Sequence, residues 1–293
     1  MKITDIDIRM CRHKETGMKD SEMRDGKKSD LEFLVITFHT DEGLSSSTFG
    51  FAGRGAAMAG EIANSIFKPF FIGRDPLYRE KHWHEYRTAD RWWNHAPIYS
   101  YGPFDINCWL LSSMKAEQPL YKYLGAYRDS VPIYGSSLVL KTPDAYAKEA
   151  LEYKNRGFNA YKLHPPGDYD FDLEAHKAVR KAVGDDFKLM SDPVAPYTFE
   201  QALRFGRELE KLNYYWYEEP LFDENFHNLR ELTRILDIPI VGTEVLAKHP
   251  YSVAECISTR VVDVVRADPS WSGGITATMK TAHLAESFGV SCE

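Results

Sequence analysis

Four acidic residues recur at nearly even intervals in the C-terminal half of the chain. Asp192, Glu218, Glu244 and Asp268 each stand at the end of a short apolar run. The steps are 26 residues from 192 to 218, 26 from 218 to 244 and 24 from 244 to 268. A strand, a helix and two loops together take a similar length, so the spacing indicates successive βα units with one acidic group after each strand.

Three of these carboxylates form a candidate metal site. Parallel strands joined through helices end on one face, so Asp192, Glu218 and Glu244 are expected to converge. Buried carboxylates at close range repel one another unless some are protonated or a cation lies between them. Mg²⁺ suits such an oxygen-only shell, whereas zinc prefers Cys and His ligands. Any one of the three could instead be a loop residue or a helix N-cap, and the regular series favours the metal site.

Lys162 and His164 are candidates for proton transfer. Lys162 lies 30 residues before Asp192, and His164 follows two positions later. Alternate residues of a strand point to the same side, so the pair offers one cation and one proton-transfer group together. The alternative is that both face solvent at an ordinary strand end.

The first 125 residues read as strands followed by helices. Alternating apolar residues predict strands at 2–9 and 31–40, with a polar loop or lid at 12–30 between them. The glycine-rich stretch 49–55 fits no phosphate-binding pattern and is interpreted as a plain loop. Helical patterns cover 56–67, 76–87 and 103–124.

From residue 126 onwards strand and helix alternate. Strands are predicted near residues 132, 160, 189, 216, 241, 264 and 290. Helix starts are indicated by Thr142-Pro143, by a capping box at Thr198 to Gln201, and by Gly273-Gly274. This is an α/β pattern of the TIM-barrel type, because no G-x-G-x-x-G opens a doubly wound sheet. Seven strands are one fewer than a closed barrel needs, so we expect an incomplete barrel.

Composition narrows the class of protein. The 293 residues are 43% hydrophobic and 27% charged, which is typical of a soluble globular protein. A formal charge of −7 argues against nucleic acid or an anionic membrane as a general partner. The four cysteines are scattered, and neither a signal peptide nor a transmembrane run is evident, so we expect a cytoplasmic location.

The motifs together resemble the enolase superfamily, mandelate racemase subgroup. Tyr161-Lys162-Leu163-His164 sits where that family carries Lys-x-Lys, and Glu218-Glu219-Pro220 matches its Glu-Glu-Pro. Gly242-Thr243-Glu244 matches the third ligand, and Asp268 precedes Gly273-Gly274 as the aspartate of the family's catalytic Asp–His pair does. The resemblance implies an α+β capping domain, 1–125, followed by a modified (β/α) barrel, 126–293.

The resemblance also implies a reaction. Mg²⁺ on Asp192, Glu218 and Glu244 would stabilise the enediolate formed when the proton alpha to a substrate carboxylate is removed. Lys162, His164 and Asp268 would be the catalytic residues. The partner would be a small-molecule carboxylate, and we expect a homo-oligomer.

Three positions depart from the family pattern. His164 replaces the second lysine, and Val194 stands where the family often has asparagine. Asp268 should orient a histidine after the next strand, and none of the histidines present fills that role by position.

Dehydration of a sugar acid, an aldonate or aldarate, is the first hypothesis, because the polar residues of the 12–30 loop suit a hydroxyl-rich substrate better than an aromatic one. A racemase, epimerase or cycloisomerase would share the first step, and a non-catalytic protein could retain the metal site. A Schiff-base aldolase using Lys162 is a further alternative, although it leaves the three carboxylates unexplained.

Overall fold

The computed structural model describes residues 1–13, 31–53, 56–93 and 96–293. The chain divides into two compact units, which are described separately. Unit 1 comprises Met1–Asp129 and Ala267–Ala282, and unit 2 comprises Ser130–Arg266 and His283–Glu293. The predicted domain boundary at residue 125 remains a prediction. In the described part of the chain, every helix is too short or too polar to cross a bilayer.

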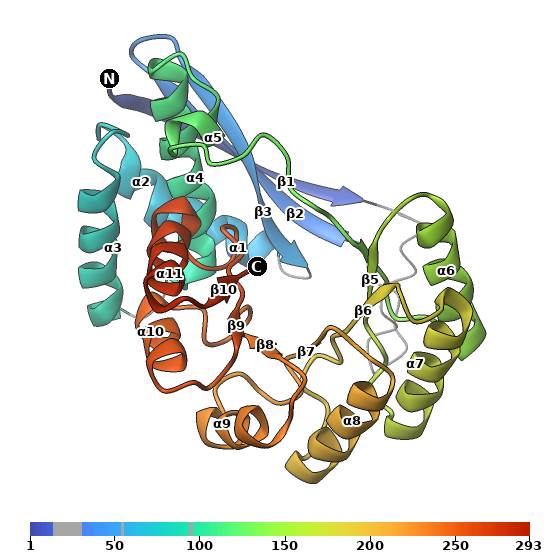
Figure 1. Cartoon of the computed structure of the whole chain (residues 1–293). Coiled ribbons are helices and arrows are strands. Elements are labelled where there is room, and N and C mark those ends of the chain that lie inside the picture. Colours follow the sequence, from blue (N-terminus) through green and yellow to red (C-terminus); the bar gives the residue numbers. More distant parts are fainter. Residues whose placement is uncertain (14–30, 54–55, 94–95) are drawn as a thin grey trace. The chain divides into compact units, whose positions relative to one another are not determined.

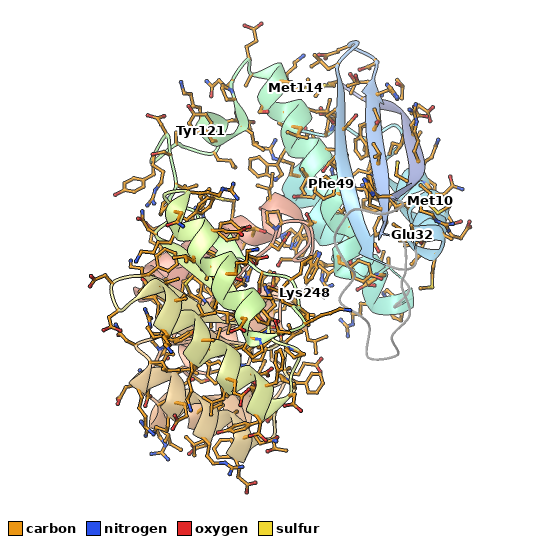
Figure 2. All side chains as sticks on the ribbon, turned by 90° about the vertical axis from the view of Figure 1, so that its right-hand side faces the viewer. Met10, Glu32, Phe49, Met114, Tyr121 and Lys248 are labelled. Carbon is orange, nitrogen blue, oxygen red and sulfur yellow. The ribbon has the colours of Figure 1, made fainter. Side chains whose placement is uncertain are left out.

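An antiparallel sheet forms the first layer of unit 1. Its strands are β1 (Ile3–His13), β2 (Leu31–Thr40) and β3 (Ser45–Gly53), in the order β1-β2-β3 (Figure 1). The predicted strand at 31–40 is confirmed. From residue 34 to residue 40 the even-numbered residues of β2, such as Ile36 and Phe38, are buried, so one face of the sheet packs on the core. Phe49 pairs with Val35 on the opposite face and is 58% exposed (Figure 2).

Two predictions for this region were wrong. The stretch 49–55 was interpreted as a loop, but β3 runs through Gly53. Gly50 pairs with Leu34 in this strand, and the close approach of Pro103 accounts for the glycine, because a Cβ at that position would lie 3.2 Å from the proline ring. The loop predicted at 12–30 begins later, since Arg12 and His13 belong to β1. Its remaining residues lie outside the described ranges.

Helices cover the buried face of this sheet. They are α1 (Ala56–Ile62), the π-helix η1 (Ala63–Phe67), α2 (Lys68–Phe71), α3 (Arg79–Trp93), α4 (Ile98–Lys115) and α5 (Leu120–Tyr123). Stacked rings hold them together, with Tyr86 and Tyr101 4.2 Å apart and Phe71 and Phe104 5.5 Å apart. The single helix predicted over 103–124 was wrong. Helix α4 ends at Lys115, because Glu117 adopts a left-handed conformation and a new helix begins after Pro119.

Helix α11 (Gly274–Phe288) is tied to α4 within unit 1. The Asp105 carboxylate accepts hydrogen bonds from the Thr276 backbone N–H, at 2.8 Å, and from its hydroxyl, at 2.6 Å. The Trp109 ring N–H donates to the same hydroxyl at 2.9 Å. Gly274 has a φ of +89°, and a Cβ there would overlap the Asp105 side chain. Glycine is therefore required at the start of this helix.

The variant Gly274→Ala should lower the free energy of unfolding by about 2–4 kcal/mol, because it adds both overpacking and a left-handed alanine. Urea denaturation followed by circular dichroism measures this loss. Gly43→Ala is the matched control, since Gly43 has a φ of +79° and nothing within 4 Å of a new Cβ. If the two variants lose equal stability, the overlap with Asp105 contributes nothing.

Seven parallel strands form the sheet of unit 2. They lie in the order β10-β9-β8-β7-β6-β5-β4, so each pairs with its neighbour in the chain. The strands are β4 (Gly135–Ser136), β5 (Ala160–Leu163), β6 (Lys188–Ser191), β7 (Trp216–Glu218), β8 (Ile240–Gly242), β9 (Val264–Val265) and β10 (Ser291–Cys292). The predicted number of strands and their positions are confirmed, except at the first. Val131 and Ile133 are exposed, and pairing begins only at Gly135, after Pro132.

Helices connect these strands on the outer side of the curved sheet (Figure 1). They are α6 (Pro143–Asn155), α7 (Tyr169–Val183), α8 (Phe199–Lys211), α9 (Phe226–Ile235) and α10 (Pro250–Ser258). The predicted helix starts are confirmed. Thr142 caps α6, and Thr198 and Gln201 form a complete capping box on α8. The main core lies between helices and sheet and includes Leu189, Phe205 and Ile240.

Candidate active site

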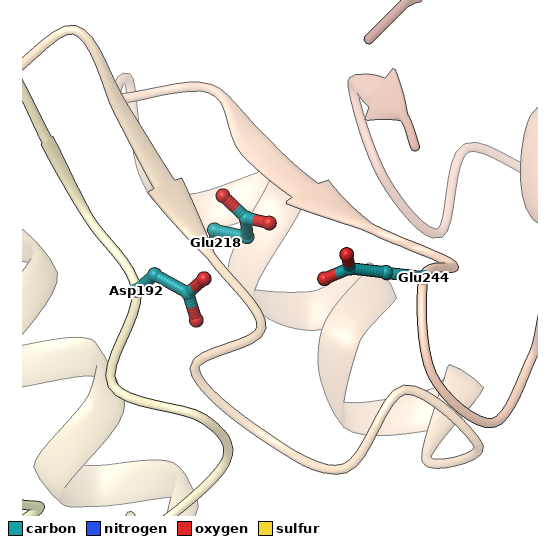
Figure 3. A group of neighbouring side chains, drawn as sticks. All are labelled: Asp192, Glu218 and Glu244. Atoms are coloured by element: carbon teal, nitrogen blue, oxygen red, sulfur yellow. The ribbon is translucent and has the colours of Figure 1, made fainter. Parts of the chain in front are cut away.

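Three carboxylates meet at the C-terminal ends of neighbouring strands in unit 2. Asp192 follows β6, Glu218 is the last residue of β7, and Glu244 comes two residues after β8. One ligand oxygen from each lies within 4.8 Å of the others (Figure 3). Asp192 and Glu218 are buried, and Glu244 is partly exposed. The structure therefore brings the three predicted ligands together, and their role as metal ligands stays a prediction.

Left-handed backbone occurs within two residues of each carboxylate. Val194, Glu219 and Thr243 have φ angles of 59°, 38° and 81°. A β-branched residue in this region is strained, and such strain persists only where surrounding contacts hold it. Thr243 is held on both sides of its hydroxyl, which donates to the Arg266 carbonyl at 3.0 Å and accepts from the Arg266 N–H at 3.2 Å. These conformations turn the chain sharply after the strands and direct the acidic side chains to one place.

Lys162 on β5 lies against two of the carboxylates. Its Nζ is 2.9 Å from Asp192 Oδ2 and 2.8 Å from Glu218 Oε2, and the side chain is only 2% exposed. Burial lowers the pKa of Lys162, but the charges of Asp192 and Glu218 outweigh burial and raise the pKa above its usual value. Lys162 is therefore a cation in this arrangement.

His164 reaches the same carboxylate oxygen as Lys162. Its Nε2 is 3.0 Å from Asp192 Oδ2, while its Nδ1 is 2.7 Å from the Ser137 carbonyl. A carbonyl and a carboxylate both only accept, so each ring nitrogen donates in this arrangement, and Nε2 is the one whose proton lies at the carboxylate cluster and can be exchanged. Burial would raise the pKa of Asp192, but the hydrogen bond from His164 and the charge of Lys162 lower it to about 2.

Arg266 is a member of the cluster that the sequence analysis missed. It follows β9 directly, and its Nη1 donates to Glu218 Oε1. Its Nε lies 3.4 Å from Glu244 Oε1 and 3.2 Å from Glu293 Oε2. The available signal was its position, because Arg266 stands after β9 as Asp192 stands after β6. In the sequence, the apolar run that contains β9 continues past Arg266, and Asp268 at its end was taken as the functional residue.

Two further carboxyl groups hold the backbone around Glu244. Glu219 Oε1 accepts from the N–H groups of Glu244, at 3.2 Å, and Val245, at 3.4 Å. Asp223 Oδ2 accepts from the N–H groups of residues 246–247, at 2.8 and 2.7 Å. Burial, with the nearby acidic groups, raises the pKa of Glu219 to about 8. These bonds fix the loop that carries Glu244.

Asp268 belongs to the other compact unit. Its Oδ1 accepts from the Ser270 N–H at 2.7 Å, and its carbonyl accepts from the Ser272 N–H at 2.7 Å. These contacts order the turn that leads into α11. The predicted catalytic role of Asp268 stays a prediction.

The donor set of the three carboxylates fits a magnesium ion. All three offer oxygen, the donor type that Mg²⁺ prefers. Ligand oxygens around an octahedral Mg²⁺ lie about 2.9–4.2 Å apart, given metal–oxygen distances of about 2.0–2.1 Å. The observed limit of 4.8 Å is close to that range, so small side-chain movements would bring the three oxygens to the spacing of Mg²⁺ ligands and leave the other positions to water or substrate.

Comparison with known proteins assigns the chain to a family. Residues 145–293 match the family described as enolase C-terminal domain-like. The chain belongs to the enolase superfamily. Its relatives place it in the mandelate racemase-like branch, as the motifs predicted.

Individual relatives of this enolase-superfamily chain are dehydratases of sugar acids. It is 30% identical to arabinonate dehydratase of Saccharolobus solfataricus, over 82% of this chain and 68% of the relative. It is 29% identical to L-talarate/galactarate dehydratase of Salmonella typhimurium, over 94% and 71% respectively. Other relatives are epimerases, racemases and cycloisomerases.

Solved structures confirm the fold class. The D-glucarate dehydratase of Agrobacterium tumefaciens, complexed with magnesium, matches with a TM-score of 0.88 and 32% identity. The match covers 100% of this chain and 80% of that protein. The predicted α+β part and barrel-type sheet are thus those of the superfamily.

Proposed function

We propose that this enolase-superfamily chain is a Mg²⁺-dependent dehydratase of a sugar acid, an aldonate or aldarate. The observation that carries the proposal is the convergence of Asp192, Glu218 and Glu244 beside Lys162 and His164. This cluster combines an oxygen-only cation site with two groups that move protons or hold positive charge. The proposal includes a homo-oligomer and domains at 1–125 and 126–293.

The proposed chemistry begins with removal of the proton alpha to the substrate carboxylate. That proton is weakly acidic, because its removal leaves a second negative charge on the substrate. When bound, Mg²⁺ supplies positive charge that stabilises the substrate oxygens. Lys162 holds a further positive charge at Nζ in a buried position, where electrostatic stabilisation is strong.

His164 is the proposed proton carrier. Its Nδ1–H is fixed by the Ser137 carbonyl, so the ring exchanges protons at Nε2. Dehydration then requires a proton donor to the departing hydroxyl on the next carbon. Lys162, His164 and Asp268 are the residues proposed to catalyse these proton transfers.

The names of the relatives favour dehydration as the first candidate reaction and isomerisation as the second. The three proteins described above are named as dehydratases of arabinonate, talarate or galactarate, and glucarate. A racemase or epimerase would carry out the same first step and return the proton to the carbon. The second candidate is retained because relatives at 26–27% identity are named as epimerases, racemases and cycloisomerases.

A screen of acid sugars with MgCl₂ tests the proposal. Each compound is incubated with the protein in ordinary water and assayed for a keto acid, and in parallel in D₂O for exchange of the alpha proton by NMR. A keto acid product supports the dehydratase. Exchange without loss of water would replace it with the isomerase. Metal binding without either reaction would leave a binding protein, and a borohydride-trapped adduct on Lys162 would indicate the Schiff-base aldolase.

A further inference from the structure

Arg266 is a partly buried cation that the proposed reaction does not use. It follows β9, and its side chain is 21% exposed. The guanidinium donates to Glu218 and lies 3.4 Å from Glu244, so it contacts two of the three candidate ligands. Its third contact is to the Glu293 carboxylate, at 3.2 Å, so every ion pair of the guanidinium in the described part of the chain is to a carboxylate. Arg266 and a bound metal ion would therefore share the same carboxylate ligands.

Each of the three carboxylates has a protein cation beside it. Asp192 faces Lys162, Glu218 faces Lys162 through one oxygen and Arg266 through the other, and Glu244 faces Arg266. Three carboxylates this close would repel strongly without such partners. Arginine stays charged at every physiological pH, so Arg266 offsets part of this repulsion permanently.

Arg266 would oppose the binding of a divalent ion to the same oxygens through two effects. The ion weakens the bonds from the guanidinium to Glu218 and Glu244, because both cations draw on the same carboxylate charge. It is also repelled by the positive charge a few ångströms away. Both effects oppose metal binding, while the same contacts stabilise the protein without metal.

We propose that Arg266 is an internal counter-cation that competes with the divalent metal for Glu218 and Glu244, and thereby sets the metal affinity of the site. The inference rests on the metal site of the proposed function, but on none of its chemistry. The opposing interpretation is that Arg266 positions the two carboxylates for the metal. The two interpretations predict opposite changes in affinity when the charge is removed.

Calorimetric titration of the full chain with MgCl₂ and with MnCl₂ distinguishes them. Arg266→Gln should bind both ions at least about tenfold more tightly than the unaltered protein, because a neighbouring positive charge is lost. In EDTA the same variant should have a lower Tm than the unaltered protein, because it lacks the cation that offsets the carboxylate charges. Added Mg²⁺ should then raise the Tm of the variant by more than it raises that of the unaltered protein. Arg234→Gln is the matched control, since Arg234 pairs with Glu231 on the surface of α9 and, among the residues the structure describes, with no ligand carboxylate.

A second variant covers the case in which Arg266→Gln does not fold without metal. Arg266→Lys keeps the charge but loses the planar fork, so its affinity should rise by less than that of Arg266→Gln and should not fall. Weaker metal binding by either variant would overturn the inference and favour the positioning role. Equal binding by Arg266→Gln and Arg234→Gln would also overturn it. If the unaltered protein binds neither ion, the proposed metal site itself fails.

Discussion

Glu218→Gln should abolish measurable binding of Mg²⁺ and lower kcat/KM by about 10³ or more. Glu218 lies between the other two carboxylates, on β7, and each of its oxygens contacts a different cation. An amide of the same size carries no charge and presents hydrogens where one cation stands. Calorimetry with Mg²⁺ and the rate of product formation from the sugar acid found in the screen measure the two losses.

The matched control for this prediction is Glu149→Gln. Glu149 is a half-buried residue of α6 that accepts one hydrogen bond from Tyr161, which an amide oxygen can also accept. Removing one partner of a buried ion pair destabilises a protein by about 3–5 kcal/mol, so circular dichroism must first show that Glu218→Gln is folded. Glu244→Gln is the substitute if it is not, because Glu244 is partly exposed. Metal affinity equal to that of Glu149→Gln would contradict the ligand role.

The regular spacing of the acidic residues carried most of what the sequence could predict. A parallel βα sheet has a fixed relation between strand ends and faces, so residues after successive strands meet without further information. This is why Asp192, Glu218 and Glu244 were placed together correctly. The helix starts could also be predicted, because Thr142 and Thr198 each cap a helix through hydrogen bonds to residues three positions along the chain.

Features that depend on long-range packing were not predicted. Gly50 was assigned to a loop because it is glycine, but it pairs with Leu34 in a strand and leaves room for Pro103, far along the chain. Arg266 looked like the end of an apolar run, and only the folded sheet shows that its side chain turns towards Glu218. Helix α4 ends at Lys115 near Glu117, which has left-handed backbone. A glutamate rarely adopts that conformation, so the sequence did not indicate it.

Lys162→Met should lower the rate of alpha-proton exchange by about 10³, while binding of Mg²⁺ persists. Lys162 is buried and contacts Asp192 and Glu218, so methionine fills its space but removes the charge that would face the developing negative charge. Removing a cation from the carboxylates does not weaken their attraction for a metal, which separates this variant from Glu218→Gln. Exchange is followed by NMR in D₂O and metal binding by calorimetry, with Lys188→Met, at the opposite end of β6 from Asp192, as the control. An exchange rate near that of the control would remove Lys162 from the reaction, whereas loss of metal binding together with exchange would make it a structural support of the site.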